Sequence, residues 1–417
     1  MATTAPGVTD LCLAAREASR ALATMSSAAK DAALLRVADA LEARAPEILE
    51  ANARDLEAGR EAGLSDALMD RLALDPARLQ GIADAVRAIA ALPDPVGEVI
   101  DGQRLPNGLD VRKVRVPLGV VAIVYESRPN VTVDAAALCL KSGNAVVLRG
   151  SSAAAHSNAV LASIVAPEFP EGAVALLTGG REQLAELAGQ EGVVDLIIPR
   201  GGEGLKAALK EHATVPVMYA AAGNCHVFVD ASADLDDALK ITVNAKVQRP
   251  SVCNAAETLL VHADVAADFL PGALAELRES GVELRVDGRT RSLAGPMGDS
   301  LSEATEEDWS TEYHALILAV KVVDSAEEAI EHVNTYGSGH SEAIVTGSVD
   351  SAQAFTGGVD AACVYVNAST RFTDGGVFGM GAEIGNSTQK LHARGPIGAR
   401  ELTTYKFVVE GSGQVRE

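Results

Sequence analysis

Cys253 is the residue whose type and surroundings best suit covalent chemistry. It lies in the segment VQRPSVCN, residues 247–254, which reads as a loop between a helix and a strand. The thiolate is the nucleophilic form of cysteine, and Arg249 together with backbone N–H groups can stabilise it there. The spacing alone leaves an inert buried thiol as an open alternative, because most cysteines in protein interiors behave as small hydrophobic residues.

The remaining cysteines and the histidines offer less. An odd number of cysteines without a CxxC pair disfavours a disulfide framework and a thiolate zinc site, and it fits a reducing compartment. The eight histidines form no HxH or HxxxH pair, so we expect no metal site. We interpret the following residues as structural: Cys139, Cys225, Cys363, His226 and His392.

One glycine-rich segment could hold an anion. Arg200-Gly201-Gly202 follows a predicted strand and opens a predicted helix, where N–H groups and the helix dipole favour negative charge. The sequence contains neither a G-x-G-x-x-G fingerprint at the first strand nor a P-loop motif. A glycine-rich turn without a ligand is therefore the alternative interpretation of this segment.

Composition excludes several classes of protein. The 417 residues carry 57 acidic and 35 basic side chains, a formal net charge of −22, and 48% are hydrophobic. This length predicts two or three domains, and this charge disfavours binding to nucleic acid or to an anionic membrane. The sequence has no run of about 20 apolar residues, and its first 20 residues lack the features of a signal peptide. We expect a cytoplasmic protein with neither a nucleic-acid nor a membrane partner.

The elements that must position these residues follow an α/β pattern. Residues 9–92 predict helices, and strands alternate with helices from about residue 118 onward. Continuous apolar runs such as 120–125 are typical of parallel strands buried on both faces. The alternation predicts a doubly wound, Rossmann-like sheet, followed by a second α/β series from about residue 226. The expected strands are 120–125, 145–150, 173–179, 194–202, 226–230, 257–262, 315–323, 341–347 and 361–367.

Residues 97–118 predict an arm. Asn107-Gly108 favours a two-residue hairpin turn, and Val111, Val114 and Val116 alternate with charged residues. Such a hairpin has too little apolar surface to fold alone, so its edge needs another strand. The alternating segment 402–409 can supply that strand.

Three stretches, residues 119–150, 247–262 and 363–406, resemble the gamma-glutamyl phosphate reductase family of the aldehyde dehydrogenase superfamily. The resemblance covers nearly the whole chain. It implies an aldehyde-dehydrogenase-like α/β fold with a Rossmann-like cofactor domain, an α/β catalytic domain and a β-hairpin oligomerisation arm. The expected boundaries are 1–96 and 119–225 for the NADP-binding domain, 226–400 for the catalytic domain, and 97–118 and 401–417 for the oligomerisation elements.

The resemblance also implies a reaction: NADPH-dependent reduction of L-glutamyl 5-phosphate to L-glutamate 5-semialdehyde and phosphate, the second step of proline biosynthesis from glutamate. Cys253 matches the nucleophile that forms the thioester, and Asn130 matches the oxyanion-stabilising asparagine. Oxidising relatives carry a glutamate that activates water, whereas the matching residues 219–224 here contain no carboxylate. A reductase that must not hydrolyse its thioester is expected to lack that base.

By the same resemblance, Arg149 matches the residue that holds the adenosine ribose. Ser152 stands where NAD-specific relatives have a glutamate, so Arg149, Ser151 and Ser152 favour NADP. Gly201, with Gly202 beside it, matches the pyrophosphate-binding glycine. Glu312 matches the residue that holds the nicotinamide ribose.

Arg128, Arg249 and Arg371 lie in the matched motifs, and we expect them as a group to hold the phosphate and the α-carboxylate of the acyl phosphate substrate. The family uses its arm and tail strands in trans, which implies a homodimer or a dimer of dimers. Glutamate kinase, which makes the unstable acyl phosphate, is a candidate partner. The alternatives are a CoA-acylating aldehyde dehydrogenase and a non-catalytic cofactor-binding relative.

Overall fold

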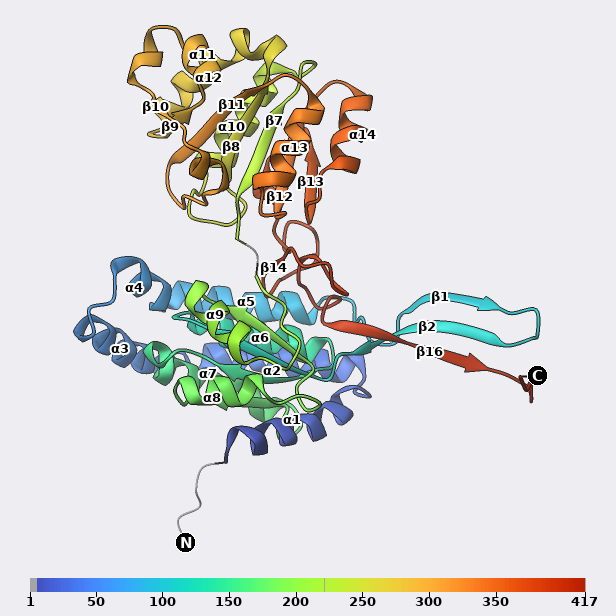
Figure 1. Ribbon diagram of the computed structural model, residues 1–417. Helices are drawn as coiled ribbons and strands as arrows, with labels where there is room; N and C mark the ends of the chain where they lie inside the picture. The colour runs from blue at the N-terminus through green and yellow to red at the C-terminus, as the bar shows by residue number, and fades with distance from the viewer. Residues whose placement is uncertain (1–5, 221, 417) are drawn as a thin grey trace. The chain divides into compact units, whose positions relative to one another are not determined.

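The computed structural model describes residues 6–220 and 222–416, which form two compact units (Figure 1). The first unit takes in the chain up to Ala220, with Gly379–Gly385 and the tail from Ile397. The second unit comprises the chain from there to Phe378 together with Asn386–Pro396. The α/β architecture with parallel sheets confirms the fold class predicted from the sequence.

Helices dominate the start of the first unit, as the sequence predicts. Ser26 caps α2 by accepting a hydrogen bond from the backbone N–H of Ala29, and Asp75 with Pro76 begins α5 in the same manner. Packing of α2 against α5 buries apolar residues of both helices. The helices are α1 (Val8–Leu22), α2 (Ser27–Ala43), α3 (Ala45–Glu61), α4 (Asp66–Leu72) and α5 (Pro76–Ala90).

A four-stranded parallel sheet in the order β5-β4-β3-β6 forms the centre of the first unit. Every residue of β3 is buried, as expected of a strand covered on both faces. Its strands are β3 (Val120–Tyr125), β4 (Ala145–Arg149), β5 (Val174–Leu177) and β6 (Leu196–Arg200). The connecting helices are α6 (Pro129–Lys141), α7 (Ala155–Val165) and α8 (Arg181–Ala188), with 3-10 turns η1 (Ser152–Ala154) and η2 (Ala166–Glu168), and α9 (Glu203–His212) follows β6.

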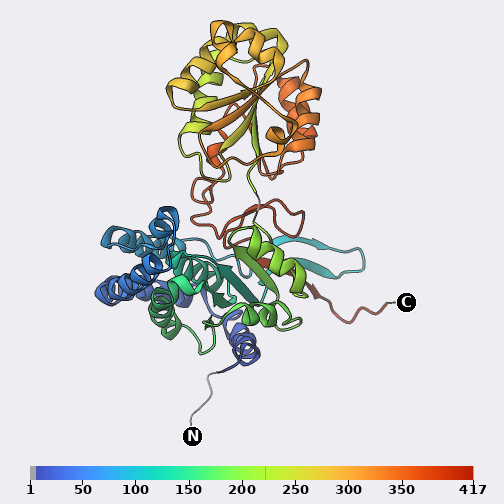
Figure 2. The ribbon, with the colours of Figure 1, turned by 60° about the vertical axis from the view of Figure 1, so that its left-hand side comes forward.

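The second unit contains a seven-stranded parallel sheet in the order β10-β9-β11-β8-β7-β12-β13, with helices on both faces (Figure 2). Side chains alternate across it: Val227 and Val229 join the larger apolar cluster, whereas Phe228 joins the smaller one. The strands are β7 (Cys225–Val229), β8 (Ala256–His262), β9 (Glu283–Val286), β10 (Ser302–Glu303), β11 (Ile317–Val323), β12 (Ser341–Val345) and β13 (Cys363–Val366).

Helices α10, α11 and α12 supply the larger cluster, and α13 and α14 supply the smaller one. A short two-stranded sheet completes this unit. The remaining elements are α10 (Leu235–Val247), α11 (Ala263–Glu279), α12 (Gly288–Leu293), α13 (Ala326–Tyr336), α14 (Val349–Gly358), η3 (Gly295–Ser300), η4 (Glu306–Ser310), η5 (Thr370–Phe372), β14 (Asn386–Ser387) and β15 (Gly395–Pro396). No helix among residues 6–220 and 222–416 is both long and apolar enough to cross a membrane.

The predicted arm is present as a three-stranded antiparallel sheet of β1 (Val99–Arg104), β2 (Asp110–Pro117) and β16 (Thr403–Glu410) (Figure 1). The expectation of a two-residue turn is wrong. The loop has three residues, because Leu105 N donates to Leu109 O at 2.7 Å and Gly108 N donates to Leu105 O at 2.9 Å. Gly108 has a φ of +86°, so it provides the left-handed position that such a loop requires.

The expectation that the tail strand pairs in trans is also wrong in this structure. β16 pairs with β2 of its own chain over eight residues, from Thr403 opposite Pro117 to Glu410 opposite Asp110. The reason lies just before β16, where Asn144 Nδ2 donates to Leu402 O at 2.8 Å and Leu402 is buried in the first unit. This hydrogen bond and the burial of Leu402 place the tail beside the open edge of β2.

Candidate active site

The loop that carries Cys253 joins α10 to β8 at the amino-terminal edge of the second unit's sheet. Asp234 caps the start of α10 by accepting two backbone N–H bonds, and Gln248 ends that helix. Cys253 is partly exposed, whereas Cys12, Cys139, Cys225 and Cys363 are buried. None of the five cysteines forms a disulfide bond. The exposed thiol is therefore the one that the sequence singled out.

The backbone carbonyl of Cys253 contacts residues at and just before the start of β7. Cys225 Sγ donates to the carbonyl oxygen of Cys253 at 3.2 Å. Gly223 lies so close that a Cβ atom there would be 1.6 Å from the same oxygen. Only glycine fits at position 223, because any side chain would displace the loop. No local pattern in the sequence indicates this contact, since 30 residues separate the two positions.

Asn254 ties the loop to the segment that contains η5. Its Nδ2 donates to Thr373 O at 2.9 Å and to Arg371 O at 3.3 Å. Thr370 Oγ1 returns a hydrogen bond to Asn254 O at 2.7 Å. These bonds bring Arg371 to the Cys253 loop, where its Nε donates to Gln248 Oε1 at 2.8 Å.

The electrostatics of this edge favour an anion. Burial lowers the pKa of the half-buried Arg371, and the charge of Arg249 lowers it further, whereas Cys253 acts in the opposite direction. Two guanidinium groups that repel each other beside a nucleophile are stabilised when an anion binds between them. The structure thus brings two arginines of the predicted group, Arg249 and Arg371, to the Cys253 loop, whereas the third, Arg128, belongs to the first unit.

Glu312 lies in the second unit with a carboxylate that is 16% exposed. Its Oε2 is 3.4 Å from His314 Nε2, and its buried Oε1 has no hydrogen-bond partner among the described residues. An unpaired buried carboxylate oxygen is costly unless a ligand hydroxyl donates to it. This geometry fits the ribose-binding role that the resemblance implies.

A buried ion pair that the sequence did not reveal lies near Glu312. Lys246 Nζ of α10 is 2.5 Å from Glu257 Oε2 of β8, and both side chains are fully buried. Burial raises the pKa of Glu257 to about 7, while Lys246 opposes that rise and Glu312 adds to it. An 11-residue separation across a loop offers no helical or strand period, so no pattern in the sequence could have paired them.

In the first unit, the candidate cofactor residues lie at the carboxyl ends of β3, β4 and β6, where open α/β sheets bind ligands. Arg149 is the last residue of β4. Its Nη2 donates to Gly180 O at 3.1 Å, and its buried Nε has no partner among the described residues. Burial lowers the pKa of Arg149, and Glu126 opposes this. An anionic ligand would satisfy the orphaned donor.

The neighbouring loop is held in a constrained shape. Ser127 has a φ of +40°, and its backbone N–H donates to Ser151 Oγ at 3.1 Å. Ser152 is exposed beside it at the start of η1. Ser151 therefore links the loops that follow β3 and β4.

An acidic side chain already lies at the glycine-rich turn before α9. Gly202 N donates to Glu126 Oε2 at 2.9 Å, and a Cβ on Gly201 would be 2.6 Å from that oxygen. The helix N-terminus thus binds an anion in this structure, and that anion is a carboxylate of the protein itself. Glu126 was missed, although its place directly after β3 is a signal for a ligand-facing residue.

Asn130 lies in the first turn of α6, and its Nδ2 donates to Asp134 Oδ2 at 2.9 Å. Burial raises the pKa of Asp134 to about 6, against the hydrogen bond from Asn130. The half-buried Arg128 precedes this helix as its N-cap residue. The predicted site residues divide between the two units. Those of the first unit are Arg128, Asn130, Arg149, Ser151, Ser152, Gly201 and Gly202. Those of the second unit are Arg249, Cys253, Glu312 and Arg371.

Comparisons with known proteins agree with this geometry. The profile of the aldehyde dehydrogenase family matches residues 1–302 and 301–408. The gamma-glutamyl phosphate reductase of Syntrophomonas wolfei is 57% identical over 408 residues, 96% of either chain, and that of Thermobifida fusca is 58% identical over 96% of this chain and 97% of its own.

The crystal structure of the gamma-glutamyl phosphate reductase from Thermotoga maritima superposes with a TM-score of 0.96 at 48% identity. The superposition covers 99% of this chain and all of that one. Both the sequence and the fold therefore match over nearly the whole length. The chain belongs to the aldehyde dehydrogenase family, in the group of the gamma-glutamyl phosphate reductases.

Proposed function

We propose that this chain reduces L-glutamyl 5-phosphate to L-glutamate 5-semialdehyde and phosphate, with NADPH, as the second step of proline biosynthesis. The observation that carries the proposal is the partly exposed Cys253 held beside Arg249 and Arg371. Relatives named gamma-glutamyl phosphate reductase at 57% and 58% identity support the same substrate.

The chain's own residues account for the acyl-transfer half of the reaction. The Cys253 thiolate attacks the acyl carbon, a carbon–sulfur bond forms, and the bond to the phosphate oxygen breaks. Arg249 and Arg371 offset the charge on the phosphate before and after it leaves. Asn130, which donates from one amide hydrogen to Asp134, is the proposed oxyanion donor. Residues 219–224 supply no carboxylate to activate water against the thioester.

A nicotinamide cofactor follows from membership of the family, and we propose NADPH as the form used. When bound, it supplies the hydride that reduces the thioester to the semialdehyde. Arg149, with its unpaired Nε, and the adjacent Ser151 and Ser152 suit the 2′-phosphate of the adenosine ribose. Gly201 and Gly202 suit the pyrophosphate, and the unpaired Glu312 Oε1 suits a ribose hydroxyl.

The decisive experiment is the reverse reaction. Purified protein with L-glutamate 5-semialdehyde and NADP⁺ should form NADPH only when inorganic phosphate is present, and alkylation of the thiols should stop it. Omission of phosphate is the internal control. Turnover that requires coenzyme A instead of phosphate would identify a CoA-acylating aldehyde dehydrogenase, and no turnover with either would favour a non-catalytic relative.

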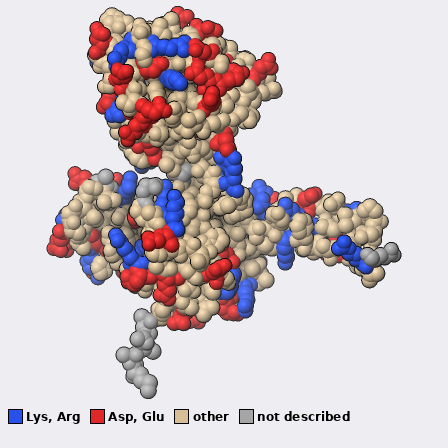
Figure 3. Space-filling view, viewed as in Figure 1, with Lys and Arg blue, Asp and Glu red and all other residues tan. Residues whose placement is uncertain are grey.

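We also propose that the arm mediates a homodimer or a dimer of dimers. Tyr405, Phe407 and Val409 of β16 are 48%, 63% and 54% exposed, which is unusual for three large apolar residues on one strand. Arginine and lysine side chains lie among uncharged ones on the arm (Figure 3). Glutamate kinase is a candidate transient partner, and a pull-down combined with channelling kinetics would test it.

The assembly can be tested by removing the tail. A chain ending at Leu402 should lose the exposed apolar strand and have a lower mass by light scattering. The matched control is Lys406→Ala, which changes a neighbouring exposed residue of the same strand. An oligomer of unchanged mass in the truncated chain would exclude β16 from the interface.

A further inference from the structure

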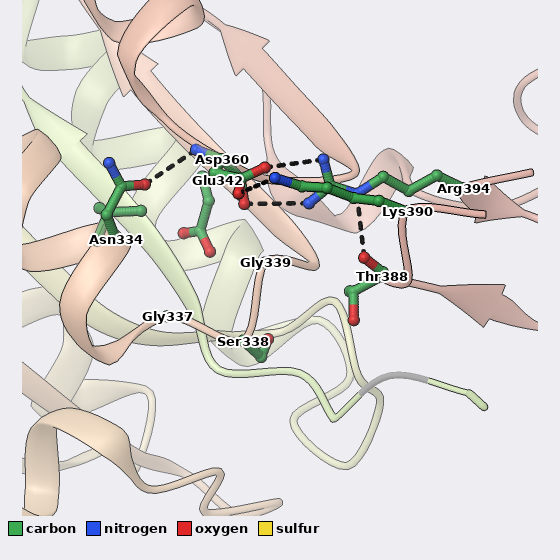
Figure 4. Close-up of a pocket in the computed structure, with 10 residues that line it drawn as sticks. Asn334, Gly337, Ser338, Gly339, Glu342, Asp360, Thr388, Lys390 and Arg394 are labelled. Carbon is green, nitrogen blue, oxygen red and sulfur yellow. Dashed lines mark hydrogen bonds and ion pairs between the residues drawn. The ribbon is translucent and has the colours of Figure 1, made fainter.

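The second unit contains a pocket of about 260 Å³ that none of the roles above uses. It lies where β12 and β13 begin, at the amino-terminal edge of the sheet (Figure 4). Gly337, Ser338 and Gly339 form one wall, and Thr388, Lys390 and Arg394 form another. Glycine is required at both positions, because a Cβ on Gly337 would be 2.5 Å from Val333 O and 3.1 Å from Glu342 Oε1, and Gly339 has a φ of +71°.

Two cations at the rim, Lys390 and Arg394, share the single carboxylate of Asp360. Arg394 Nη1 donates to Asp360 Oδ1 at 2.9 Å, and Lys390 Nζ donates to Asp360 Oδ2 (Figure 4). Arg394 Nε also donates to Thr388 O at 3.1 Å. Lys390 is 65% exposed, so it can turn toward a ligand at little cost.

Glu342 is the second carboxylate among the residues that line the pocket. Its side chain is fully buried, and its Oε2 accepts hydrogen bonds from the backbone N–H of His226 at 2.7 Å and from His226 Nδ1 at 2.9 Å. Its Oε1 has no partner among the described residues and faces the Gly337–Gly339 segment (Figure 4). A buried carboxylate oxygen without a donor is costly unless a ligand supplies one.

The pocket and Cys253 share one edge of one sheet. Cys253 precedes β8, Glu342 lies at the start of β12, and β7 lies between these strands. The residues just before β7 contact both sides. Asn224 N donates to Ser338 Oγ of the pocket wall at 3.0 Å, and the adjacent Gly223 contacts Cys253 O. Two strand spacings amount to roughly 10 Å.

The geometry points to this pocket as the site for the α-ammonium group of the substrate, with Glu342 as its counter-ion. This inference rests on the proposed function. Arg249 and Arg371 account for anionic groups of the acyl phosphate, and the carboxylate of Glu312 is proposed above for a ribose hydroxyl, so the ammonium group of the substrate has no partner among the residues assigned above. In the thioester the acyl carbon lies about 1.8 Å from Cys253 Sγ, the α-nitrogen lies four bonds or about 5 Å farther on, and a hydrogen bond adds about 2.8 Å, roughly 10 Å in all. The substrate can therefore span the distance between Cys253 and Glu342. Aldehydes and acyl phosphates that carry an α-amino group are then the preferred substrates.

Two aldehydes that differ only in the amino group provide the test. The kcat/KM of the wild-type protein is measured with L-glutamate 5-semialdehyde and with 5-oxopentanoate, each with phosphate and NADP⁺. We expect a preference of roughly ten- to a hundredfold for the amino aldehyde, the range for a hydrogen bond to a charged group. Glu342→Gln should reduce that ratio toward one, chiefly through the KM of the amino aldehyde.

Glu331→Gln, at an exposed position of α13, is the matched control and should keep the wild-type ratio. Equal wild-type kcat/KM values for the two aldehydes would overturn the inference without any variant and leave the proposed function intact. A Glu342→Gln protein that loses activity equally with both aldehydes would overturn it as well. If the wild type turns over neither aldehyde, the proposed function itself fails and this inference fails with it.

Discussion

The two sheets present their candidate ligand residues at opposite edges. In the first unit these residues follow the carboxyl ends of β3, β4 and β6, where α6 and α9 begin. In the second unit Cys253 precedes β8, directly after the end of α10. Helix N-termini offer unpaired N–H groups to an anion, whereas helix C-termini present carbonyl oxygens that repel one.

The difference explains the side chains found at each edge. The Gly201-Gly202 turn holds a carboxylate, that of Glu126, through the backbone N–H of Gly202, and the charge of Arg149 acts on the same carboxylate. The Cys253 loop lies at the unfavourable end of a helix dipole, so positive charge has to come from Arg249 and Arg371. We therefore expect charge-removing substitutions to have their largest effect at the second unit's edge.

Replacement of the nucleophile should have the largest effect of all. Cys253→Ser should abolish phosphate-dependent turnover, because a serine hydroxyl without an adjacent base is poorly activated at neutral pH. Cofactor binding, measured by fluorescence titration, should stay nearly intact. Cys139→Ser, in the buried interior of α6, is the control and should lower stability more than kcat. A Cys253→Ser protein that keeps more than about a tenth of wild-type kcat, a barrier increase below roughly 1.4 kcal/mol, would falsify the role.

Loss of the half-buried guanidinium should come next. Arg371→Ala should lower kcat/KM. The corresponding loss of transition-state stabilisation should be about 2–5 kcal/mol, the range for removing one partner of a desolvated charged contact. Arg371→Lys keeps the charge but not the planar hydrogen bond to Gln248, so it should recover only part of the activity. The rate of Cys253 alkylation by iodoacetamide should fall in the same order. Equal alkylation rates in all three proteins would show that Arg371 does not activate the thiol.

At the first unit's edge, the expected effect is on cofactor choice. Arg149→Ala should weaken NADPH binding by roughly 1.5–3 kcal/mol and NADH binding much less. Ser152→Glu should act in the same direction, because its carboxylate would repel a 2′-phosphate. The measurement is the ratio of the two Kd values, with Ser152→Ala as the neutral control. An unchanged ratio in both variants would place the adenosine ribose elsewhere.

The smallest expected effect concerns Asp134, whose pKa burial raises to about 6. A pKa raised by folding means that this group's contribution to stability is complete below about pH 4 and is lost as the pH rises through about 6. Asp134→Asn removes that dependence, so between pH 4 and 7.5 its free energy of unfolding should rise relative to wild type by about 1–3 kcal/mol. Urea titrations at both pH values test this, and a difference independent of pH would contradict it.

Much of the fold followed from local pattern. The apolar run of β3 was predicted at the residues where it occurs, because a strand buried on both faces has a strong local signal. β9 and β10 were missed because both are short and lie toward one side of the sheet, with exposed residues among them. The arm was predicted, but its loop length and the chain that supplies its third strand were not.

The candidate site was predictable where one segment carries the chemistry. Cys253 and Arg249 lie four residues apart, and Arg149 ends a strong strand with Ser152 three residues after it. The contacts of Gly223 with Cys253, of Lys246 with Glu257 and of His226 with Glu342 could not be found in this way. The first and third of these contacts join strands that only the order of the sheet brings together, and the second spans a loop, so none of them has a local signal.

The pairing of β16 with β2 has a consequence for how the chain folds during synthesis. β2 ends at Pro117 and β16 begins at Thr403, so 403 − 117 = 286 residues must be translated before the third strand exists. At 5–20 residues per second, the hairpin waits for roughly 15–60 s with one edge open. During that interval the tail of a neighbouring completed chain can take the vacant place, since it would make the same hydrogen bonds. Ribosome-bound chains that end before residue 403 should therefore show a protease-sensitive hairpin, and an equally resistant hairpin would indicate that it folds without its third strand.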